Sequence, residues 1–309
     1  MTNVNNTEES IIHFLTNEYK NKSKHIRAYK LIRLLSLSQS VLRYIIKFRK
    51  VINLGNPKDL NQKIIWLAFN NEDLSWTMLA DKLGVHDYLK ALNLYNLSVP
   101  VYKVWNRAED IDFSLLPNSF VIKTNHGCGD VFVVKDKNKV DENDIKKKLD
   151  YYMHKPYGLV TGEPHYLRIK PYVFAEKILD NDSTLSSSII DYKFFCFHGE
   201  PKCVLVCYDR KGLSAQKIVY DLDWNIREDL TNLSNDSIIK HIPKPKSFDV
   251  MVDACRKLGK PFDFTRIDFY ESGGKPYFGE MTFTPAAGRS TALSQKALDW
   301  LGSFVYCKK

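Results

Sequence analysis

The residues best suited to chemistry lie in a predicted hairpin over 265–282, near the end of the chain. Residues two apart in a strand share a face, so Arg266 and Asp268 point the same way. The same holds for Glu280 and Thr282 in the second strand, and the two pairs meet across the hairpin. Two carboxylates and a hydroxyl suit Mg²⁺ when phosphate oxygens and water complete its shell, and a guanidinium suits a phosphoryl group. Cross-strand salt bridging on a solvated face is the alternative, and it stays open here.

A second segment combines a lysine with a glycine-containing loop between two predicted strands. Lys123 ends the first strand, and Gly127 and Gly129 let backbone N–H groups approach an anion. These features suit a polyphosphate, although the loop lacks the G-K-[ST] sequence and the following helix of a Walker A motif. A plain hairpin with a surface lysine is the alternative. His126 and Cys128 lie too close together in a tight loop to activate one another, so we expect no nucleophile there.

A third segment consists of an apolar strand that ends in Glu176-Lys177, a polar insert over 183–188 and a strand that starts near Asp191. A strand that ends beside a polar loop suits the edge of a nucleotide pocket. The segment says little without the other two.

The elements that must position these residues change in character along the chain. Hydrophobic spacing predicts helices over 10–50, 59–72, 75–93, 141–152 and 247–259, with Asp141 as a helix cap. β-Branched and aromatic runs predict strands over 99–104, 120–123, 131–134, 172–178, 189–197, 202–207, 218–221, 264–270 and 277–283. Turn residues at 198–201 and 271–274 join several of these strands into hairpins. The pattern is typical of an α+β protein with antiparallel strands.

Charge is unevenly distributed over the 309 residues, whose formal net charge is +9. Residues 1–50 hold ten Lys or Arg and three acidic residues, so this segment alone contributes +7. Its predicted helix sets apolar residues against basic ones: Val41, Leu42, Ile45 and Ile46 opposite Arg43, Lys47, Arg49 and Lys50. Such a helix indicates peripheral contact with an anionic membrane or a glycan, and a solvated helix face is the alternative. No nucleic-acid motif accompanies it, so we expect no nucleic-acid partner.

The N-terminus lacks the basic start and apolar stretch of a signal peptide, and no window approaches 18 apolar residues. The six cysteines are scattered, and Cys203 and Cys207 have no further ligands at zinc spacing. Reduced thiols in a cytoplasmic protein are the expectation.

In this order, the segments resemble the ATP-grasp superfamily, and they are most similar to its TupA-like branch, which is named for a teichuronopeptide biosynthesis protein. The resemblance covers roughly residues 55–290. It is carried by Phe120-Val-Ile-Lys-Thr-Asn-His-Gly127, Ala175-Glu-Lys177, Asp191-Tyr-Lys-Phe-Phe-Cys-Phe-His-Gly-Glu-Pro-Lys202, Arg266-Ile-Asp268 and Tyr277-Phe-Gly-Glu-Met-Thr-Phe-Thr-Pro285. It implies an α+β ATP-grasp fold, in which two α+β subdomains grip ATP, with a mainly helical N-terminal region. The chain then divides into a basic helical extension over 1–52, a helical region over 53–98 and a catalytic domain over 99–309.

Carried over by position, the resemblance implies an ATP site that draws on all three segments. Lys123 contacts the α- or β-phosphate. The predicted phosphate-covering loop consists of Gly127, Cys128 and Gly129. The remaining ATP contacts are the adenine pocket at Glu176, Lys177 and Ile178 and the ribose contact at Asp191.

The resemblance also implies a reaction centre on the last hairpin. Asp268 and Glu280 bind Mg²⁺, and Arg266 stabilises the transferring phosphoryl group. Lys193 points toward the phosphates or the substrate. Many ATP-grasp ligases have Asn two residues after the second of these carboxylates, whereas this chain has Thr282, a weaker ligand that puts a second metal ion in doubt.

The implied activity is that of a Mg-ATP-dependent ligase, which activates a carboxylate as an acyl phosphate for attack by an amine. The resemblance further implies a role in surface or capsular polysaccharide assembly, joining an amino acid and a sugar acid. A phosphotransferase would use the same ATP site. The sequence also leaves open a glycosyltransferase, with Asp221-Leu-Asp223 as its D-x-D motif, and a degenerate scaffold without activity.

Overall fold

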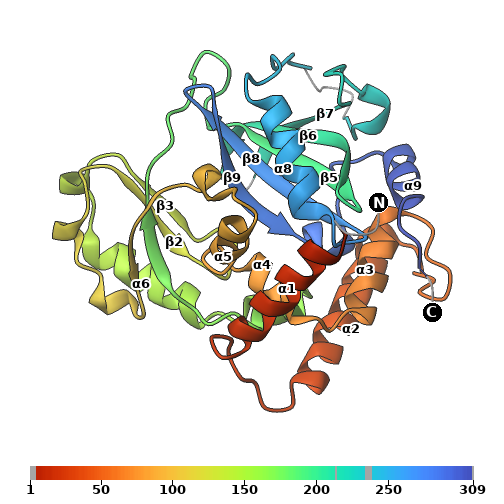
Figure 1. Cartoon of the computed structure of the whole chain (residues 1–309), viewed down its shortest axis with the longest axis horizontal. Coiled ribbons are helices and arrows are strands. Elements are labelled where there is room, and N and C mark those ends of the chain that lie inside the picture. The colour runs from red at the N-terminus through yellow and green to blue at the C-terminus, as the bar shows by residue number, and fades with distance from the viewer. Residues whose placement is uncertain (1–4, 213, 234–238, 308–309) are drawn as a thin grey trace.

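The computed structural model describes residues 5–212, 214–233 and 239–307, and it consists of two antiparallel sheets with helices around them (Figure 1). The first third of the chain is helical, as predicted, but it is more divided than predicted. Its helices are α1 (Asn5–Lys20), α2 (Tyr29–Phe48), α3 (Leu60–Asn70), α4 (Leu74–Ala80) and α5 (Val85–Ala91). The prediction of one helix over 10–50 was wrong. The backbone N–H groups of Lys22 and Ser23 close α1 on the carbonyl of Tyr19, and Ala28 takes a left-handed conformation before α2 begins.

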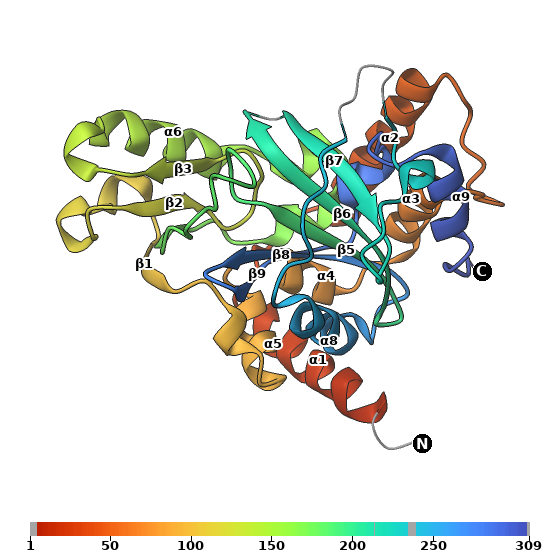
Figure 2. The ribbon, with the colours of Figure 1, turned by 90° about the horizontal axis from the view of Figure 1, so that it is seen from above.

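The smaller sheet carries the predicted phosphate loop. It has the order β1-β4-β2-β3, and its strands are β1 (Val101–Trp105), β2 (Phe120–Thr124), β3 (Val131–Val134) and β4 (Val173–Glu176). Helix α6 (Glu142–His154) packs on it, and Asp141 caps this helix, as predicted, by accepting from two backbone N–H groups. Phe120, Ile122 and Leu149 are fully buried between the sheet and the helix. Figure 2 shows this unit as a separate lobe beside the larger sheet.

The larger sheet carries the last hairpin. It has the order β7-β6-β5-β8-β9, and its strands are β5 (Asp191–Phe197), β6 (Glu200–Lys211), β7 (Ser214–Tyr220), β8 (Thr265–Ser272) and β9 (Lys275–Thr282). Both predicted hairpin turns form. Gly199 and Gly273-Gly274 have positive φ values there, which glycine adopts without steric cost. Helix α8 (Phe248–Gly259) packs on β5, β6 and β8 through an aromatic and aliphatic core.

Two short helices that the sequence analysis did not predict complete the fold: α7 (Tyr157–Thr161) and α9 (Gln295–Gly302). Helix α7 is followed by the 3₁₀ turn η5 (Pro164–Arg168), and both pack against α2. All six cysteines are free thiols. Among the described residues, no helix combines the length and the apolar character needed to cross a membrane.

Helix α2 buries several polar side chains beside Leu37 and Tyr44, and it exposes several aliphatic ones. Its buried face carries Arg33, Ser36 and Ser40, whose side chains donate to backbone carbonyls of other elements. Its outer face carries a stripe of five aliphatic side chains, each at least half exposed: Leu31, Leu34, Leu35, Leu42 and Ile46. We call these five residues the leucine stripe. Val41 and Ile45, which were predicted to share a face with Leu42 and Ile46, are partly buried, and Val41 packs against the cluster of Tyr44, Ile52 and Ile65.

The division of the chain into domains at residues 52 and 98 stays a prediction. Ile12, Tyr19 and Leu37 from the first segment belong to the same hydrophobic core as the larger sheet.

Candidate active site

The last hairpin brings its four predicted residues together as the strand spacing requires. Asp268 lies opposite Glu280 and Arg266 opposite Thr282, with a bulge between Asp268 and Phe269. The guanidinium of Arg266 donates to both oxygens of Asp268, at 2.7 Å each, and to Oε1 of Glu280 at 2.7 Å. It also lies 3.1 Å from the hydroxyl of Thr282. One arginine therefore gathers both predicted metal ligands and the hydroxyl into a single cluster.

The neighbouring strand extends this cluster into a chain of alternating charges. Lys193 lies opposite Asp268 in the β5–β8 register, and its ammonium donates to that carboxylate. The same ammonium lies 3.6 Å from Asp191, which also accepts from Arg210 on β6. The resulting ionic network consists of Arg210, Asp191, Lys193, Asp268, Arg266 and Glu280.

Burial and charge act against each other in this ionic network. Burial raises the pKa of the Asp268 carboxyl, and Arg266 and Lys193 oppose that shift. Burial would also raise the pKa of Glu280, but Arg266, Lys193 and Lys82 outweigh it and lower the pKa to about 2. Burial lowers the pKa of Lys193, yet Asp268 and Asp191 leave it above its ordinary value. Lys193 and Glu280 are therefore charged at neutral pH.

The predicted phosphate loop is held by contacts from outside its own hairpin. The side chain of Asn125 donates to Asp81 at 2.8 Å and to the carbonyl of Lys170 at 3.1 Å. The ammonium of Lys82 donates to the carbonyl of Gly127, and its charge also acts on Glu280. The loop is thus anchored on the turn between α4 and α5, and the Lys82 that holds it lies close to the last hairpin.

Lys123 and the end of β4 form the side of the candidate site that belongs to the smaller sheet. Lys123 Nζ lies 2.6 Å from Oε1 of Glu176, so a predicted phosphate contact pairs with a predicted adenine contact. The backbone N–H of Lys177 donates to the carbonyl of Pro100 at 2.9 Å, after which Ile178 leads toward the larger sheet. That these residues bind the phosphates and the adenine stays a prediction, as does the ribose contact of Asp191.

The donor set on the hairpin fits Mg²⁺ bound together with a nucleotide. Within the described residues, no cluster of three or more His, Cys, Asp or Glu side chains could hold a metal ion. Asp268 and Glu280 supply two carboxylates, and Mg²⁺ in nucleotide sites usually takes one or two carboxylates plus phosphate oxygens and water. The hydroxyl of Thr282 lies 3.0 Å from Glu280 Oε1 on the same face.

Two residues that contact the candidate site escaped prediction from the sequence. Arg210 lies at the far end of a long hairpin strand, where spacing alone did not bring it to Asp191. Lys82 was given no role in the sequence analysis, and its contact with the glycine loop joins segments 45 residues apart. The β5–β6 register pairs Asp191 with Cys207 rather than with Arg210, and nothing local marks Lys82.

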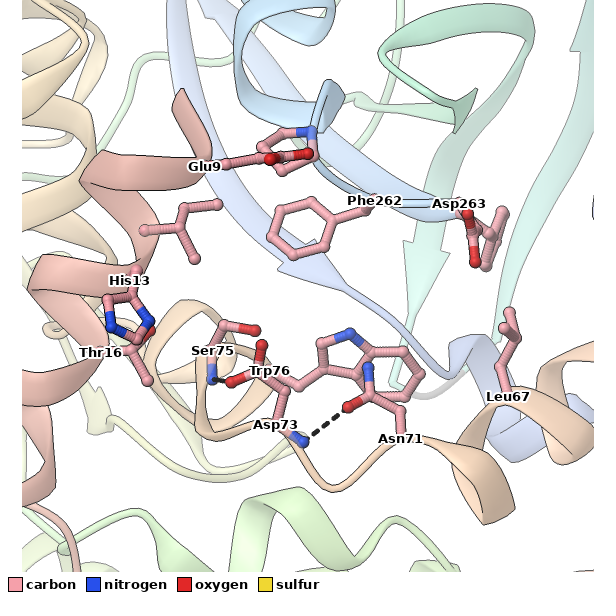
Figure 3. A pocket seen from close by; sticks show the side chains of 13 residues that line it. Glu9, His13, Thr16, Leu67, Asn71, Asp73, Ser75, Trp76, Phe262 and Asp263 are labelled. Carbon is pink, nitrogen blue, oxygen red and sulfur yellow. Dashed lines mark hydrogen bonds between the residues drawn. The ribbon is translucent and has the colours of Figure 1, made fainter. Parts of the chain in front are cut away.

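A separate cavity of about 480 Å³ contains none of the predicted site residues. Figure 3 shows it between α1, the start of α4 and the segment before β8, with His13, Trp76 and Phe262 in its walls. We assign it no role in the candidate active site.

The model of the TupA-like ATPgrasp family matches residues 62–306. Among curated proteins, none matches the chain significantly.

Solved structures that match this chain include three ligases, each with a TM-score below 0.5. The D-alanine–D-alanine ligase of Bacillus anthracis, in a complex with ATP, has 15% identity and a TM-score of 0.45, over 75% of this chain and 66% of that one. The corresponding ligase of Helicobacter pylori has 13% identity and a TM-score of 0.43, over 80% of this chain and 69% of that one. The ATP-grasp ligase PsnB, complexed with a minimal precursor, has 13% identity and a TM-score of 0.39, over 78% and 67%. The chain thus spans just under two thirds of the first ligase, and the likeness concerns the fold alone.

The two sheets, the loop and the hairpin define an α+β protein of the ATP-grasp class, which in general comprises ATP-dependent ligases. Within that class, the chain belongs to the TupA-like ATP-grasp family.

Proposed function

We propose that this protein is a Mg-ATP-dependent carboxylate–amine ligase that joins a sugar acid and an amino acid during surface polysaccharide assembly. The observation that carries the proposal is the cluster of Arg266, Asp268 and Glu280 on the last hairpin, with Lys193 beside it. The sugar acid and the polysaccharide come from the family resemblance.

The proposed reaction has two steps. A carboxylate oxygen forms a bond to the γ-phosphorus of ATP while the bond from that phosphorus to ADP breaks, which leaves an acyl phosphate. The amine nitrogen then bonds to the acyl carbon, loses a proton, and inorganic phosphate departs with the electron pair of the broken C–O bond. Mg²⁺, when bound, offsets the phosphate charge.

The chain's own residues position the reactants and balance charge. Arg266 has a planar fork that can move from Asp268 and Glu280 to the oxygens of a phosphoryl group, since both are bidentate acceptors. Lys193 adds positive charge from β5 of the larger sheet, and Lys123 adds it from β2 of the smaller sheet. Positioning and electrostatics of this kind supply most of the catalysis in phosphoryl transfer.

The D-x-D motif of a glycosyltransferase finds no support. Oδ1 of Asp221 accepts from the backbone N–H groups of Asp223 at 3.1 Å and Asn225 at 2.8 Å. The Asp221 carboxylate therefore closes a turn, which accounts for the motif without a metal ion.

Trapping with hydroxylamine tests the proposed reaction. A panel of uronic acids and amino acids is incubated with Mg-ATP and hydroxylamine, which converts an acyl phosphate into a hydroxamate. The proposal expects a hydroxamate together with ADP, lost in Asp268→Asn and retained in Asp249→Asn, whose side chain is 91% exposed on α8. A sugar phosphate formed without hydroxamate would establish a phosphotransferase instead.

We also propose that α2 docks the protein on an anionic lipid surface from the cytoplasmic side. The leucine stripe supplies apolar side chains for the acyl region. Lys30, Arg43, Lys47, Arg49 and Lys50 are exposed on or near the same helix, and they would face anionic headgroups. Sedimentation with phosphatidylserine vesicles tests this contact. If a glycan bound the leucine stripe and displaced the protein from these vesicles, the lipid assignment would be overturned.

A further inference from the structure

A cavity of about 850 Å³ lies on the outer side of the phosphate loop. Its walls come from the linker between α1 and α2, the segment after β1, and the region from the end of α6 to Pro171. The mechanism proposed above uses none of its charged residues. The volume falls in the range that holds a ligand of several rings.

The cavity carries an excess of positive charge. Its walls contain five Lys or Arg and two acidic residues, Glu109 and Asp150. Glu109 pairs with Arg107, and Asp150 lies 3.5 Å from His154. Among the described residues, no carboxylate lies within ion-pair distance of the four remaining cations, which are Lys24, Arg27, Lys155 and Lys170. Such an arrangement favours an anionic ligand.

A buried histidine at this cavity lacks a partner. His126 is only 4% exposed, and its Nδ1 has no hydrogen-bond partner in the part of the chain that the structure describes. Burial lowers its pKa to about 4, with Lys82 and Lys24 adding to the shift and Asp130 opposing it. At neutral pH the ring is therefore uncharged and can give or accept one hydrogen bond. An unsatisfied buried polar atom is rare, and a ligand oxygen in the cavity would satisfy this one.

The walls suit rings better than an extended peptide. Tyr157 and Tyr166 meet edge to face, with ring centroids 5.2 Å apart, and Pro156 and Pro171 lie beside them in the walls. None of the lining residues belongs to a strand, so the cavity has no strand edge to pair with a peptide backbone.

The same tyrosines connect the cavity with the candidate active site. Burial raises the pKa of Tyr157, and the nearby charges of Glu163, Cys128 and Glu280 raise it further. Burial, Glu163 and Glu280 raise the pKa of Tyr166 in the same way. Both rings line the cavity, and Glu280 is among the charges close enough to act on them.

We propose that this cavity binds an acidic oligosaccharide, whose carboxylates face Lys24, Arg27, Lys155 and Lys170 and whose oxygens reach His126. The inference rests on the proposed function, because it names the sugar-acid substrate as an oligomer rather than a single residue. Tyr157 and Tyr166 are positioning residues for the sugar rings.

Calorimetry with trigalacturonate, in the absence of nucleotide, tests this proposal. We expect binding to the full chain, weaker by about tenfold or more when Lys24→Gln and Arg27→Gln are combined. The control combines Lys20→Gln with Lys22→Gln, which removes equal charge outside the cavity, and binding should not change. His126→Asn should weaken binding while the thermal midpoint shows that the variant folds. Maltotriose, which is uncharged, should not bind.

Separate outcomes distinguish this proposal from the proposed function. Triglutamate binding without trigalacturonate binding would overturn the saccharide assignment. Trigalacturonate binding that both double variants weaken equally would overturn the site. Mg-ATP binding is measured in the same samples: if ATP binds and trigalacturonate does not, this inference fails alone, and if trigalacturonate binds and ATP does not, the ligase proposal fails.

Discussion

The β8–β9 hairpin and helix α2 both bury polar side chains, but they do so by different means. In the hairpin, Arg266, Asp268 and Glu280 are charged and satisfy one another across adjacent strands. In α2, Ser36 and Ser40 are neutral and donate to backbone carbonyls of other elements. The hairpin partners lie 2 to 16 residues apart in the chain, whereas the two serines reach carbonyls 122 and 247 residues away.

The difference shows what each region is built for. The hairpin holds charge ready for exchange, because a bound phosphate can take the place of a carboxylate on Arg266. Helix α2 is held by close packing against Gly162: a Cβ added to Gly162 would lie 2.8 Å from the Cβ of Ser40. Leu37 and Tyr44 of α2 are buried, but the leucine stripe lies outside, where it is free to contact something else.

The largest expected effect comes from breaking the hairpin cluster. Arg266→Ala should lower ATP turnover by roughly 10²–10³-fold, since a preorganised donor to the transferring group is lost. Arg266→Lys should retain only part of the wild-type rate of ATP turnover, because an ammonium lacks the planar fork of the guanidinium. Arg256→Ala on α8, where the arginine is half exposed, is the control for initial-rate measurements. Equal rates for all variants would remove Arg266 from the reaction.

The next effect tests the close packing of α2. Gly162→Ala places a side chain against Ser40 at a φ of +83°, and we expect the free energy of unfolding to fall by about 2–4 kcal/mol in urea titrations. Gly212→Ala has φ +60° and open space around it, so it isolates the backbone cost of about 1–2 kcal/mol. Equal losses of unfolding free energy in the two variants would mean that α2 does not pack closely against Gly162.

Acid should weaken the region under α2 before it affects the hairpin. Burial lowers the pKa of His165, in η5, to about 3, while an unfolded histidine titrates near 6.5. Between these values only the unfolded chain takes up the proton, so stability falls as pH drops, by about 1.4 kcal/mol per unit for this residue. His86 and His126, both near pKa 4, contribute with the same sign.

The Glu280 carboxyl behaves differently. Its pKa is lowered to about 2 in the folded protein, whereas the pKa in the unfolded chain is near 4.3. Its contribution to stability is therefore fully present above pH 4.3 and is lost as the pH falls toward 2. Unfolding measured from pH 7 to pH 5 should therefore show a smaller slope in His165→Gln than in the wild type. An unchanged slope would contradict the neutral burial of His165.

The smallest effect on stability is expected from the leucine stripe. Leu34→Ser combined with Leu42→Ser should change the free energy of unfolding by less than about 0.5 kcal/mol per site, since both side chains are more than half exposed. Binding to phosphatidylserine vesicles should nevertheless be lost. Leu115→Ser, at a site equally exposed on another face, should leave vesicle binding intact. A large loss of stability would show that the stripe is a packing surface.

Local signals explain how much of this could be predicted from the sequence. The hairpin cluster was predicted because strand spacing and a short turn place its residues within one element pair, and the α+β class followed from similar patterns. Helix α2 was predicted as a helix, but its face was not. Its leucines have the spacing of a core face, but Ser36 and Ser40 pack closely against Gly162, far along the chain. Arg210 and Lys82 escaped for the same reason, since their partners are set by tertiary packing.

The most direct test of the central claim is calorimetry of ATP binding with and without Mg²⁺, for the wild type and for Asp268→Asn combined with Glu280→Gln. The hairpin offers Mg²⁺ two carboxylates, and no cluster of three or more possible metal ligands occurs among the described residues. We therefore predict micromolar ATP binding that requires Mg²⁺, and little Mg²⁺ binding without nucleotide. The double variant should bind neither ATP nor Mg²⁺. Wild-type protein that binds no ATP would contradict the enzyme assignment and leave a degenerate ATP-grasp scaffold.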